Sequence, residues 1–283
     1  MSINFRPARQ GDAPECGRII FEAFKSLADQ HGFPPDFVDA ATGLVSMLMA
    51  TPGFHDVLAE EDHQIMGVNF IDMRPRIGGV GPIAVAPEAQ NKGLGKALMH
   101  AVMEVAVQQK TEGIRLVQAA YNNRSLCLYT GLGFETREPL SVMKGVPLSM
   151  RVPGYDVRNA TIADQELCNS LCQEVHGFDR ALEWNGAIEQ HTATVVEHQG
   201  KITGYATSVG FFAHAVAESN EDLQALIGDA TAYSGPGFLL PTRNYEALKW
   251  CLDHGLRLVM QATLMSTGQY SEPTGAYLPS ILY

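Results

Sequence analysis

Long hydrophobic runs are missing from this chain, and that absence excludes a class of protein. No stretch of its 283 residues approaches the roughly 18 consecutive apolar residues that a membrane helix requires. The opening sequence MSINFRPARQGD also has no apolar signal-peptide core, so neither export nor membrane insertion is expected. We therefore expect a cytoplasmic protein without a membrane partner.

Cysteine is scarce and irregularly placed. The 5 cysteines are odd in number and scattered, which argues against a disulfide framework. Cys168 and Cys172 are spaced so that two thiols on one helix turn could face a metal ion. They also form an ordinary apolar stripe with Leu167, Leu171 and Val175, and no second Cys or His pair completes a ligand set. No metal site is expected.

Positive charge is also in short supply. The chain has 20 Lys and Arg against 31 Asp and Glu, a net charge of -11, and no basic run, so nucleic acid is not an expected partner. The balance suits a cationic acceptor such as a free amine, although mild acidity is ordinary for soluble proteins. Hydrophobic residues make up 46% and charged residues 18%, which is typical of a folded chain, and the length is sufficient for two domains.

The most informative stretch is VGPIAVAPEAQNKGLGKALMHAVMEVAVQQ, residues Val80 to Gln109. It predicts a short buried strand through Val85, then a glycine loop, then a helix whose apolar residues recur at the 3.6-residue period. Glycine allows close approach of the backbone to a ligand, and the first amides of a helix have no partners within the helix. Such a place binds phosphate groups. A tight turn that uses glycine for steric reasons alone is the alternative.

Two blocks of sequence in order resemble the signature of the GCN5-related N-acetyltransferase (GNAT) superfamily. The first, Val85-x-Pro87-x-x-Gln90-x-x-Gly93-x-Gly95, resembles the acetyl-CoA loop of that superfamily. The second lies further along the chain and consists of Asn123, then Leu128-Tyr129, then Gly133-Phe134. Because both blocks occur at the expected separation, the chain is identified as a suspected member of the superfamily.

The resemblance implies that acetyl-CoA is the co-substrate. The implied cofactor-binding residues are Ile83, Ala84, Val85, Gln90, Asn91, Lys92, Gly93, Leu94, Gly95, Lys96 and Asn123. The two lysines would add positive charge beside the pyrophosphate; a solvated helix start is the alternative, but cations oppose the helix dipole at that end. Asn123 is expected to be an N-cap, a cofactor contact, or both.

The resemblance also implies a catalytic role for Tyr129. Its reference pKa near 10 keeps it protonated at neutral pH, so it can act as a general acid toward the departing thiolate. A tyrosine in the core is the alternative. The general base is undefined: Asp72, at the end of a predicted strand, is one candidate, and the terminal carboxylate of Tyr283 is another, because the tail GAYLPSILY is apolar enough to pack into the protein. Ordinary strand-end and edge-strand roles are the alternatives.

Periodicity predicts the elements around these motifs. Strands are expected over residues 3–9, 55–60, 65–72 and 114–120, and helices over 16–27, 37–49 and 124–130. Pro82 cannot donate to a strand ladder, so we expect a bulge that separates its strand from a neighbour. In the resembled fold this frees backbone groups for the pantetheine arm, and the first two helices form one wall of the acceptor pocket. That wall would include Phe24, His31, Phe33 and Phe37, with core packing as the alternative for each.

The second half looks like an altered copy of the first. Phe5-Arg6-x-Ala8-x-x-x-Asp12 recurs as Val157-Arg158-x-Ala160-x-x-x-Asp164, and Val57-Leu58 followed by Gly67 recurs as Val195-Val196 followed by Gly204. Asn123 to Tyr129 recurs as Asn244 to Trp250, and Gly133-Phe134 as Gly255-Leu256 with one residue inserted. The glycine loop does not recur. Its counterpart, residues 216–223, lacks both glycines and carries carboxylates that would repel a pyrophosphate.

These observations predict an α/β protein of two tandem GNAT-like domains, each a mixed β-sheet flanked by helices. Residues 1–146 would form the catalytic domain, 147–155 a linker, and 156–283 a degenerate domain with a structural or acceptor-site role. The expected activity is direct transfer of an acetyl group from acetyl-CoA to the amine of a small-molecule acceptor. A non-catalytic CoA-binding sensor or scaffold, and an acyltransferase for a longer acyl-CoA, are the alternatives. A homodimer is compatible with the sequence, which does not define an assembly.

Overall fold

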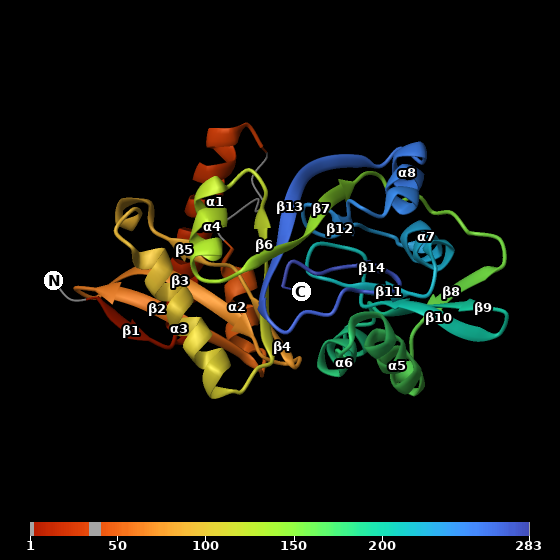
Figure 1. Cartoon of the computed structure of the whole chain (residues 1–283), viewed down its shortest axis with the longest axis horizontal. Coiled ribbons are helices and arrows are strands. Elements are labelled where there is room, and N and C mark those ends of the chain that lie inside the picture. The colour runs from red at the N-terminus through yellow and green to blue at the C-terminus, as the bar shows by residue number, and fades with distance from the viewer. Residues whose placement is uncertain (1–2, 34–40, 283) are drawn as a thin grey trace.

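The computed structural model describes residues 3–33 and 41–282, and it confirms the α/β fold class (Figure 1). A large sheet of nine strands has the order β1-β2-β3-β4-β6-β13-β7-β12, with β5 paired to β3 off this path. A small sheet of five strands has the order β14-β11-β10-β9-β8. Helices pack on both sheets, and the two lobes meet along β6, β7 and β13.

The first half of the chain follows the predicted succession of strands and helices. The first helix extends further than its apolar stripe, because Pro14 suits its first turn and Gly32, with a φ of 73°, provides the left-handed residue that ends it. The start predicted for the second helix, at residue 37, lies outside the described residues. The elements are β1 (Asn4–Arg6), η1 (Gln10–Asp12), α1 (Ala13–His31), α2 (Thr42–Ala50), β2 (Phe54–Glu61), β3 (Gln64–Asp72), β4 (Ile77–Val80), β5 (Ala84–Val85), η2 (Pro87–Ala89), α3 (Leu94–Gln108), β6 (Gly113–Ala119), α4 (Asn123–Gly131) and β7 (Glu135–Lys144).

The second half begins after an irregular segment between β7 and β8, residues 145–154, which overlaps the predicted linker. Its strands and helices repeat the succession of the first half from β8 to β13, and a short final strand follows. The elements are β8 (Tyr155–Asn159), η3 (Ile162–Asp164), α5 (Gln165–His176), α6 (Ala181–Glu189), β9 (Thr194–His198), β10 (Lys201–Ala206), β11 (Ala215–Ala217), α7 (Asn220–Asp229), β12 (Phe238–Pro241), α8 (Tyr245–Asp253), β13 (Arg257–Gly268) and β14 (Ala276–Leu278).

The predicted strand around Pro82 is split in two, and the sheet opens there. β4 pairs in parallel with β6 only over residues 77–79 and 113–115, whereas β5 pairs with β3 alone. Within the described strands, residues 116–119 of β6 therefore have no strand partner on the side that faces β5. The separation expected from the missing proline donor is confirmed.

The sheets do not follow the predicted division of the chain. The long strand β13 lies between β6 and β7, so that Thr263 is opposite both Gln118 and Pro139, and β12 extends the same sheet beyond β7. Two strands of the second half thus complete the large sheet, and the pairs of the small sheet are all antiparallel. Apolar alternation predicts a strand but not its partner, which explains why separate sheets were expected.

Each half contains an ion-paired arginine at the equivalent position, as the repeat predicts. Arg6 bonds Asp12 at 2.7 Å and Glu60 at 2.8 Å, and Arg158 bonds Asp164 at 2.8 Å and Glu197 at 2.7 Å. Because Glu60 and Glu197 occupy equivalent positions, the alignment of β2 with β9 differs by one residue from the predicted one. The counterpart of 195–196 is therefore 58–59, not 57–58.

The repeat around α4 and α8 also shifts by one residue. Asn122 caps α4 by accepting from the amide of Ser125, and Asn244 caps α8 in the same way. The amide of Phe134 then bonds the carbonyl of Tyr129 at 3.0 Å, just as Leu256 bonds Cys251 at 3.0 Å. The prediction that Trp250 corresponds to Tyr129 is wrong. The residue of the second half that corresponds to Tyr129 is Cys251, and the two segments align without the predicted insertion. Two consecutive asparagines, at 122 and 123, caused the error.

Candidate active site

A cavity of about 340 Å³ lies where β5 and β6 separate. One end is bounded by the loop that precedes α3 and by the start of α4, and the other by α1 and by residues of the second half. The open edges of β5 and β6 form its floor between these ends. The strand separation at Pro82 therefore leaves a channel between β5 and β6 in the large sheet.

The N-terminus of α3 faces this cavity. Gly93, with a φ of 83°, precedes the helix, and within the described residues no side chain caps it. Gly93, Leu94 and Gly95 all line the cavity. The first amides of a helix lack intrahelical acceptors and carry the positive end of the helix dipole, so this arrangement suits an anionic ligand such as a pyrophosphate.

Arg124 on α4 holds the loop in place. Its guanidinium donates to Gln90 Oε1 and to Asn91 Oδ1, both at 3.0 Å, and Gln90 Nε2 donates to the carbonyl of Val85 at 3.2 Å. Arg124 also lines the cavity and adds a positive charge beside the helix terminus. Sequence reasoning missed this residue, because an arginine in the first turn of a helix is usually only a solvated side chain.

Most of the predicted cofactor-binding residues line the cavity, and two do not. Asn122 lines it where Asn123 was expected, and it is also the N-cap of α4, so the cap predicted at Asn123 lies one residue earlier. Lys92 and Asn123 are exposed side chains outside the lining. The residues that do line the cavity are Ile83, Ala84, Val85, Gln90, Asn91, Gly93, Leu94, Gly95 and Lys96.

Gly95 provides a test of whether this end of the cavity is a binding site. A Cβ at Gly95 would lie 3.8 Å from Leu128 Cδ2 and 3.9 Å from Val85 Cγ2, which is ordinary contact, so the protein itself does not require glycine there. We expect Gly95→Ala to keep or raise the free energy of unfolding, by up to about 1 kcal/mol. The affinity for acetyl-CoA, measured by calorimetry, should fall at least about tenfold, because the new methyl group obstructs close approach of the ligand to the backbone.

The matched control is Gly186→Ala on α6, where no heavy atom lies within 4 Å of the added Cβ. This variant should leave acetyl-CoA affinity unchanged. Full affinity in Gly95→Ala would show that the ligand does not approach the start of α3.

Tyr129, on α4, is one of the residues that line the cavity. It is 6% exposed, and its ring packs near Phe134 with the centroids 6.1 Å apart. Burial raises the pKa of its hydroxyl to about 12, and a hydrogen bond with Ser125 opposes the shift only in part. Its hydroxyl therefore stays protonated throughout the neutral range and is available as a proton donor.

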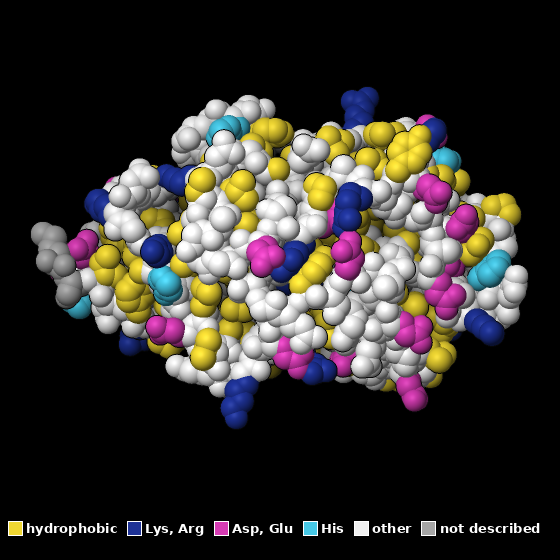
Figure 2. All heavy atoms as spheres, viewed as in Figure 1, with side chains coloured by type: hydrophobic (Ala, Val, Ile, Leu, Met, Phe, Trp, Pro, Cys, Tyr) yellow, Lys and Arg dark blue, Asp and Glu magenta, His cyan; other side chains and the backbone are white. Residues whose placement is uncertain are grey.

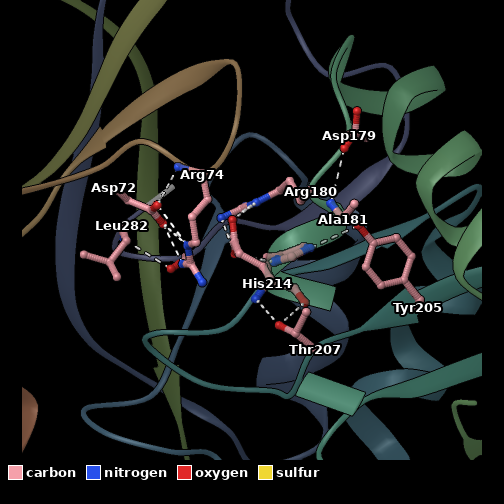
Figure 3. Close-up of polar contacts among 11 residues, drawn as sticks. Asp72, Arg74, Asp179, Arg180, Ala181, Tyr205, Thr207, His214 and Leu282 are labelled. Carbon is pink, nitrogen blue, oxygen red and sulfur yellow. Dashed lines mark hydrogen bonds and ion pairs between the residues drawn. The ribbon is translucent and has the colours of Figure 1, made fainter. Parts of the chain in front are cut away.

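The two candidates for the general base are not in the described lining. Asp72 is at the end of β3, as expected, but its carboxylate pairs with the guanidinium of Arg74 at 2.6 Å (Figure 3). Tyr283 lies outside the described residues, although its neighbours Ile281 and Leu282 line the cavity. Neither assignment is tested by this geometry, and both stay predictions.

The second half of the chain forms much of the wall opposite the glycine loop. Of the aromatic residues predicted for the acceptor wall, Phe24 lines the cavity. Phe33 stacks on Tyr121 with centroids 4.4 Å apart, His31 lies 5.2 Å from the same ring, and Phe37 lies outside the described residues. The additional wall residues are Phe211, Phe212, Met260, Ala262, Ile281 and Leu282. Sequence reasoning could not find them, since they are distant in the chain and ordinary in type.

A buried polar network anchors that wall (Figure 3). Arg180 donates twice to Glu183 at 2.7 Å, and Glu183 lies 3.2 Å from Nδ1 of His214, whose Nε2 is 3.0 Å from the hydroxyl of Tyr205. The amide of His214 donates to Thr207 Oγ1 at 3.0 Å. Burial, and after it the charge of Arg180, lower the pKa of His214 to about 4 although Glu183 opposes the shift, so its imidazole is neutral at neutral pH. The network thus fixes both ends of the segment that carries Phe211 and Phe212.

The corresponding cleft of the second half is built differently. Ala217 pairs with Gly204 as Val85 pairs with Gly67, but α7 begins at Asn220, without an intervening glycine loop. The amide of Ser219 donates to Asp222, and Ser219 Oγ accepts from the amide of Asp222 at 3.2 Å, so side chains already cap this helix. β14 also pairs with the edge of β11 that corresponds to the open edge of β5. The features that suit a pyrophosphate in the first half are therefore replaced.

Other classes of site find little support in the described part of the chain. Within residues 3–33 and 41–282, no cluster of three or more His, Cys, Asp or Glu side chains is placed to hold a metal ion. In the same ranges, no helix has the length and apolarity needed to cross a lipid bilayer. On the face shown in Figure 2, Lys and Arg side chains are dispersed among acidic ones and form no continuous basic stripe.

The fold and the cleft define a class of protein. Residues 20–134 match the sequence profile of the acetyltransferase (GNAT) family. Residues 20–134 are therefore similar to a GNAT acetyltransferase domain, and nearly the whole chain shares the fold of solved proteins that include a tandem GNAT protein.

Solved structures show this tandem fold. A putative acetyltransferase from Pyrococcus horikoshii aligns with a TM-score of 0.74 at 18% identity and covers 97% of this chain and 92% of its own. A GCN5-related N-acetyltransferase from Sphaerobacter thermophilus gives 0.65 at 16% identity, covering 95% and 96%. A tandem GNAT protein from the clavulanic acid biosynthesis pathway gives 0.58 at 13% identity, covering 96% and 100%. At these identities the likeness concerns the fold alone.

Curated relatives match over a smaller part. The mycothiol acetyltransferase of Renibacterium salmoninarum is 32% identical over 127 residues, which cover 43% of this chain and 32% of the relative. That of Pseudarthrobacter chlorophenolicus is 36% identical over 88 residues, which cover 29% and 27%. The chain thus spans less than a third of the length of these two relatives.

Proposed function

We propose that the protein is an N-acetyltransferase that moves an acetyl group from acetyl-CoA directly to the amine of a small-molecule acceptor. The observation that carries this proposal is one continuous cavity, which runs from the uncapped start of α3, past the open strand edges, to the buried hydroxyl of Tyr129. Acetyl-CoA would supply the activated acetyl thioester. The residues that would hold it are those of the glycine loop and of β5.

The loop end of the cavity suits the charged part of acetyl-CoA. Backbone amides at Gly93 to Gly95 would bind the pyrophosphate, with Lys96 and Arg124 adding positive charge at its edge. The unpaired edge of β5, residues 84–85, would hydrogen-bond the amides of the pantetheine arm, as a further strand would. The space beside Gly95 supports binding of the pyrophosphate there, because the nearest protein atoms to a Cβ at this position are at ordinary contact distance, 3.8 and 3.9 Å away.

Proton transfer would use Tyr129 as the general acid. Its raised pKa keeps the hydroxyl protonated at neutral pH. Because the reference pKa of a thiol is lower, about 8.5, the proton would pass to the sulfur only as the attacking amine gives up its own proton, so that no phenolate is left behind. The amine must be neutral to attack, and the apolar wall favours the neutral form, because desolvation lowers the pKa of an ammonium group. Asp72 and the carboxylate of Tyr283 remain the proposed bases, and Asp72 would first have to release Arg74.

The experiment that tests this proposal is amine-dependent release of thiol from acetyl-CoA by the purified protein. We expect release with at least one class of primary amine, and mass spectrometry should identify the acetylated amine. Binding of acetyl-CoA without release for any amine would instead support the sensor or scaffold. Faster release from octanoyl-CoA than from acetyl-CoA would support the longer-chain acyltransferase.

The second half is proposed to be catalytically inactive. Its helix terminus is capped by Ser219 and Asp222, its strand edge is occupied by β14, and Cys251 stands in place of the catalytic tyrosine. Calorimetric titration with acetyl-CoA should therefore give one site per chain. Gly95→Ala should weaken that site without exposing a second one, and two sites of comparable affinity would contradict the proposed inactivity.

A further inference from the structure

The geometry points to an acceptor of defined chemistry: a primary amine on an uncharged apolar body, not a polyamine, an aminoglycoside or a free amino acid. This inference rests on the proposed acetyl transfer and specifies its substrate class. It follows from the far end of the cavity, which begins beyond Tyr129 and is enclosed by α1 and the second half.

The walls of this far end are apolar. They are formed by Phe24, Leu27, Phe211, Phe212, Met260 and Leu282, with further apolar side chains between them. Of the uncharged polar lining residues, Gln90, Asn91, Asn122 and Ser125 belong to the loop before α3 or to the start of α4. The other two are Tyr129 on α4 and Gln118 on β6. The two ends of the cavity therefore differ in chemistry, which separates the charged part of the cofactor from the acceptor.

Charge is absent from the described far wall. Among the described lining residues, the charged side chains are Lys96 and Arg124, and both are at the loop end. No carboxylate of the described chain lines the cavity, so the described wall offers no counter-ion to a second ammonium group. The proposed carboxylate of Tyr283 would serve the reacting amine. A free amino acid would need a cation for its carboxylate, and the described far wall offers none.

The charged side chains behind this wall already form ion pairs or cation–π contacts. Arg180 pairs with Glu183, and Arg74 pairs with Asp72 at 2.6 Å. The guanidinium of Arg115 lies over the rings of Phe178 and Tyr270, 4.9 Å and 5.1 Å from their centroids. Recruiting any of these groups for a ligand would break an existing interaction, so they do not alter the apolar character of the wall.

The far end also has its own opening, which favours an acceptor over a long acyl chain as its occupant. Phe212 lines the cavity and is nevertheless 37% exposed, so it lies at a rim between the cavity and solvent. Phe24 and Leu27 on α1 are partly exposed as well. An amine can enter from solvent past this rim, whereas an acyl chain would arrive with the cofactor from the loop end.

A matched series of amines tests the inference. Hexylamine, 1,6-diaminohexane and 6-aminohexanoate share one chain and differ only by a terminal methyl, ammonium or carboxylate group. We expect kcat/KM with acetyl-CoA to be roughly thirtyfold or more higher for hexylamine than for either charged analogue, because each would bury an unpaired charge. Independently of turnover, calorimetry should detect binding of N-hexylacetamide, the acetylated product, and not of its 6-ammonio analogue.

Two variants test whether the acceptor binds at the rim near Phe212. Phe212→Asp adds a carboxylate at the rim and should raise the ratio of kcat/KM for 1,6-diaminohexane over hexylamine by about tenfold. Leu258→Asp, at a position on β13 that is 44% exposed and outside the cavity, is the control and should leave the ratio unchanged. An equal ratio in the two variants would overturn the placement of the acceptor site.

The outcomes distinguish this inference from the proposed function. Turnover that prefers the diamine or the amino acid would overturn the substrate class while acetyl transfer stands. Binding of acetyl-CoA without acetylation of any amine, and without binding of N-hexylacetamide, would overturn both proposals. Selective binding and acetylation of the apolar amine would support both.

Discussion

Replacing Tyr129 with phenylalanine should lower kcat for acetyl transfer by roughly 10² to 10⁴, the usual contribution of a positioned general acid. The hydroxyl is the proton donor that the buried channel offers, and its pKa of about 12 keeps it protonated. Affinity for acetyl-CoA should be nearly unchanged, because the pyrophosphate would be held at the start of α3. Stopped-flow measurement of thiol release, together with calorimetry, separates the two effects.

Tyr245→Phe provides the control for this prediction. Tyr245 is also on a helix that follows an asparagine cap, but it is 69% exposed and lies outside the cavity. Its substitution should leave kcat unchanged. A wild-type rate in Tyr129→Phe would show that water or another group protonates the leaving thiolate. Tyr129 would then be only a residue of the hydrophobic core.

Replacing Glu183 with glutamine should lower the free energy of unfolding by about 3–5 kcal/mol, the usual cost of removing one partner of a buried ion pair. Glu183 accepts two hydrogen bonds of 2.7 Å from Arg180, whose side chain is only 2% exposed, and it also faces His214. The variant leaves a buried guanidinium opposite a neutral amide. Urea unfolding measures the loss.

This substitution should also affect the acceptor and not the cofactor. The network fixes the segment that carries Phe211 and Phe212, so KM for the amine should rise while acetyl-CoA affinity is kept. Asp253→Asn, in the exposed pair of Lys249 and Asp253, is the control and should cost less than about 0.5 kcal/mol. A loss as small as the control's would mean that the network does not stabilise the folded protein.

Local features of the site were predictable from the sequence, because they depend on neighbouring residues. The helix terminus at Gly93 and the strand break at Pro82 each follow from the backbone chemistry of a single residue. The paired repeats around Arg6 and Arg158 were also predictable, because each arginine has one of its partners, Asp12 or Asp164, six residues further along the chain. Each of these features needs no knowledge of a distant segment.

Features that depend on distant segments were not predictable. The insertion of β13 between β6 and β7 joins residues more than a hundred positions apart, and alternation alone does not identify a strand's partner. For the same reason, Phe211 and Leu282 gave no sign in the sequence that they would close the cavity of the first half. The error at Asn123 has a different cause: two adjacent asparagines fit the motif equally well until the bond to Ser125 selects Asn122.

The two halves share a succession of elements and differ at the cleft. Both keep a glycine that permits close strand packing, since a Cβ at Gly67 or Gly204 would come within 2.8 Å of a neighbouring atom. The first half leaves its helix terminus uncapped and its strand edge open. The second closes both, through Asp222 and β14, and contributes its side chains to the wall of the first cleft instead.

The most direct test of the account is thiol release from acetyl-CoA in the presence and absence of hexylamine, with the product identified by mass spectrometry. We predict release that requires the amine, yields N-hexylacetamide, and is lost in Tyr129→Phe while acetyl-CoA still binds. Tight binding of acetyl-CoA with no amine-dependent release from hexylamine or any other amine would contradict it.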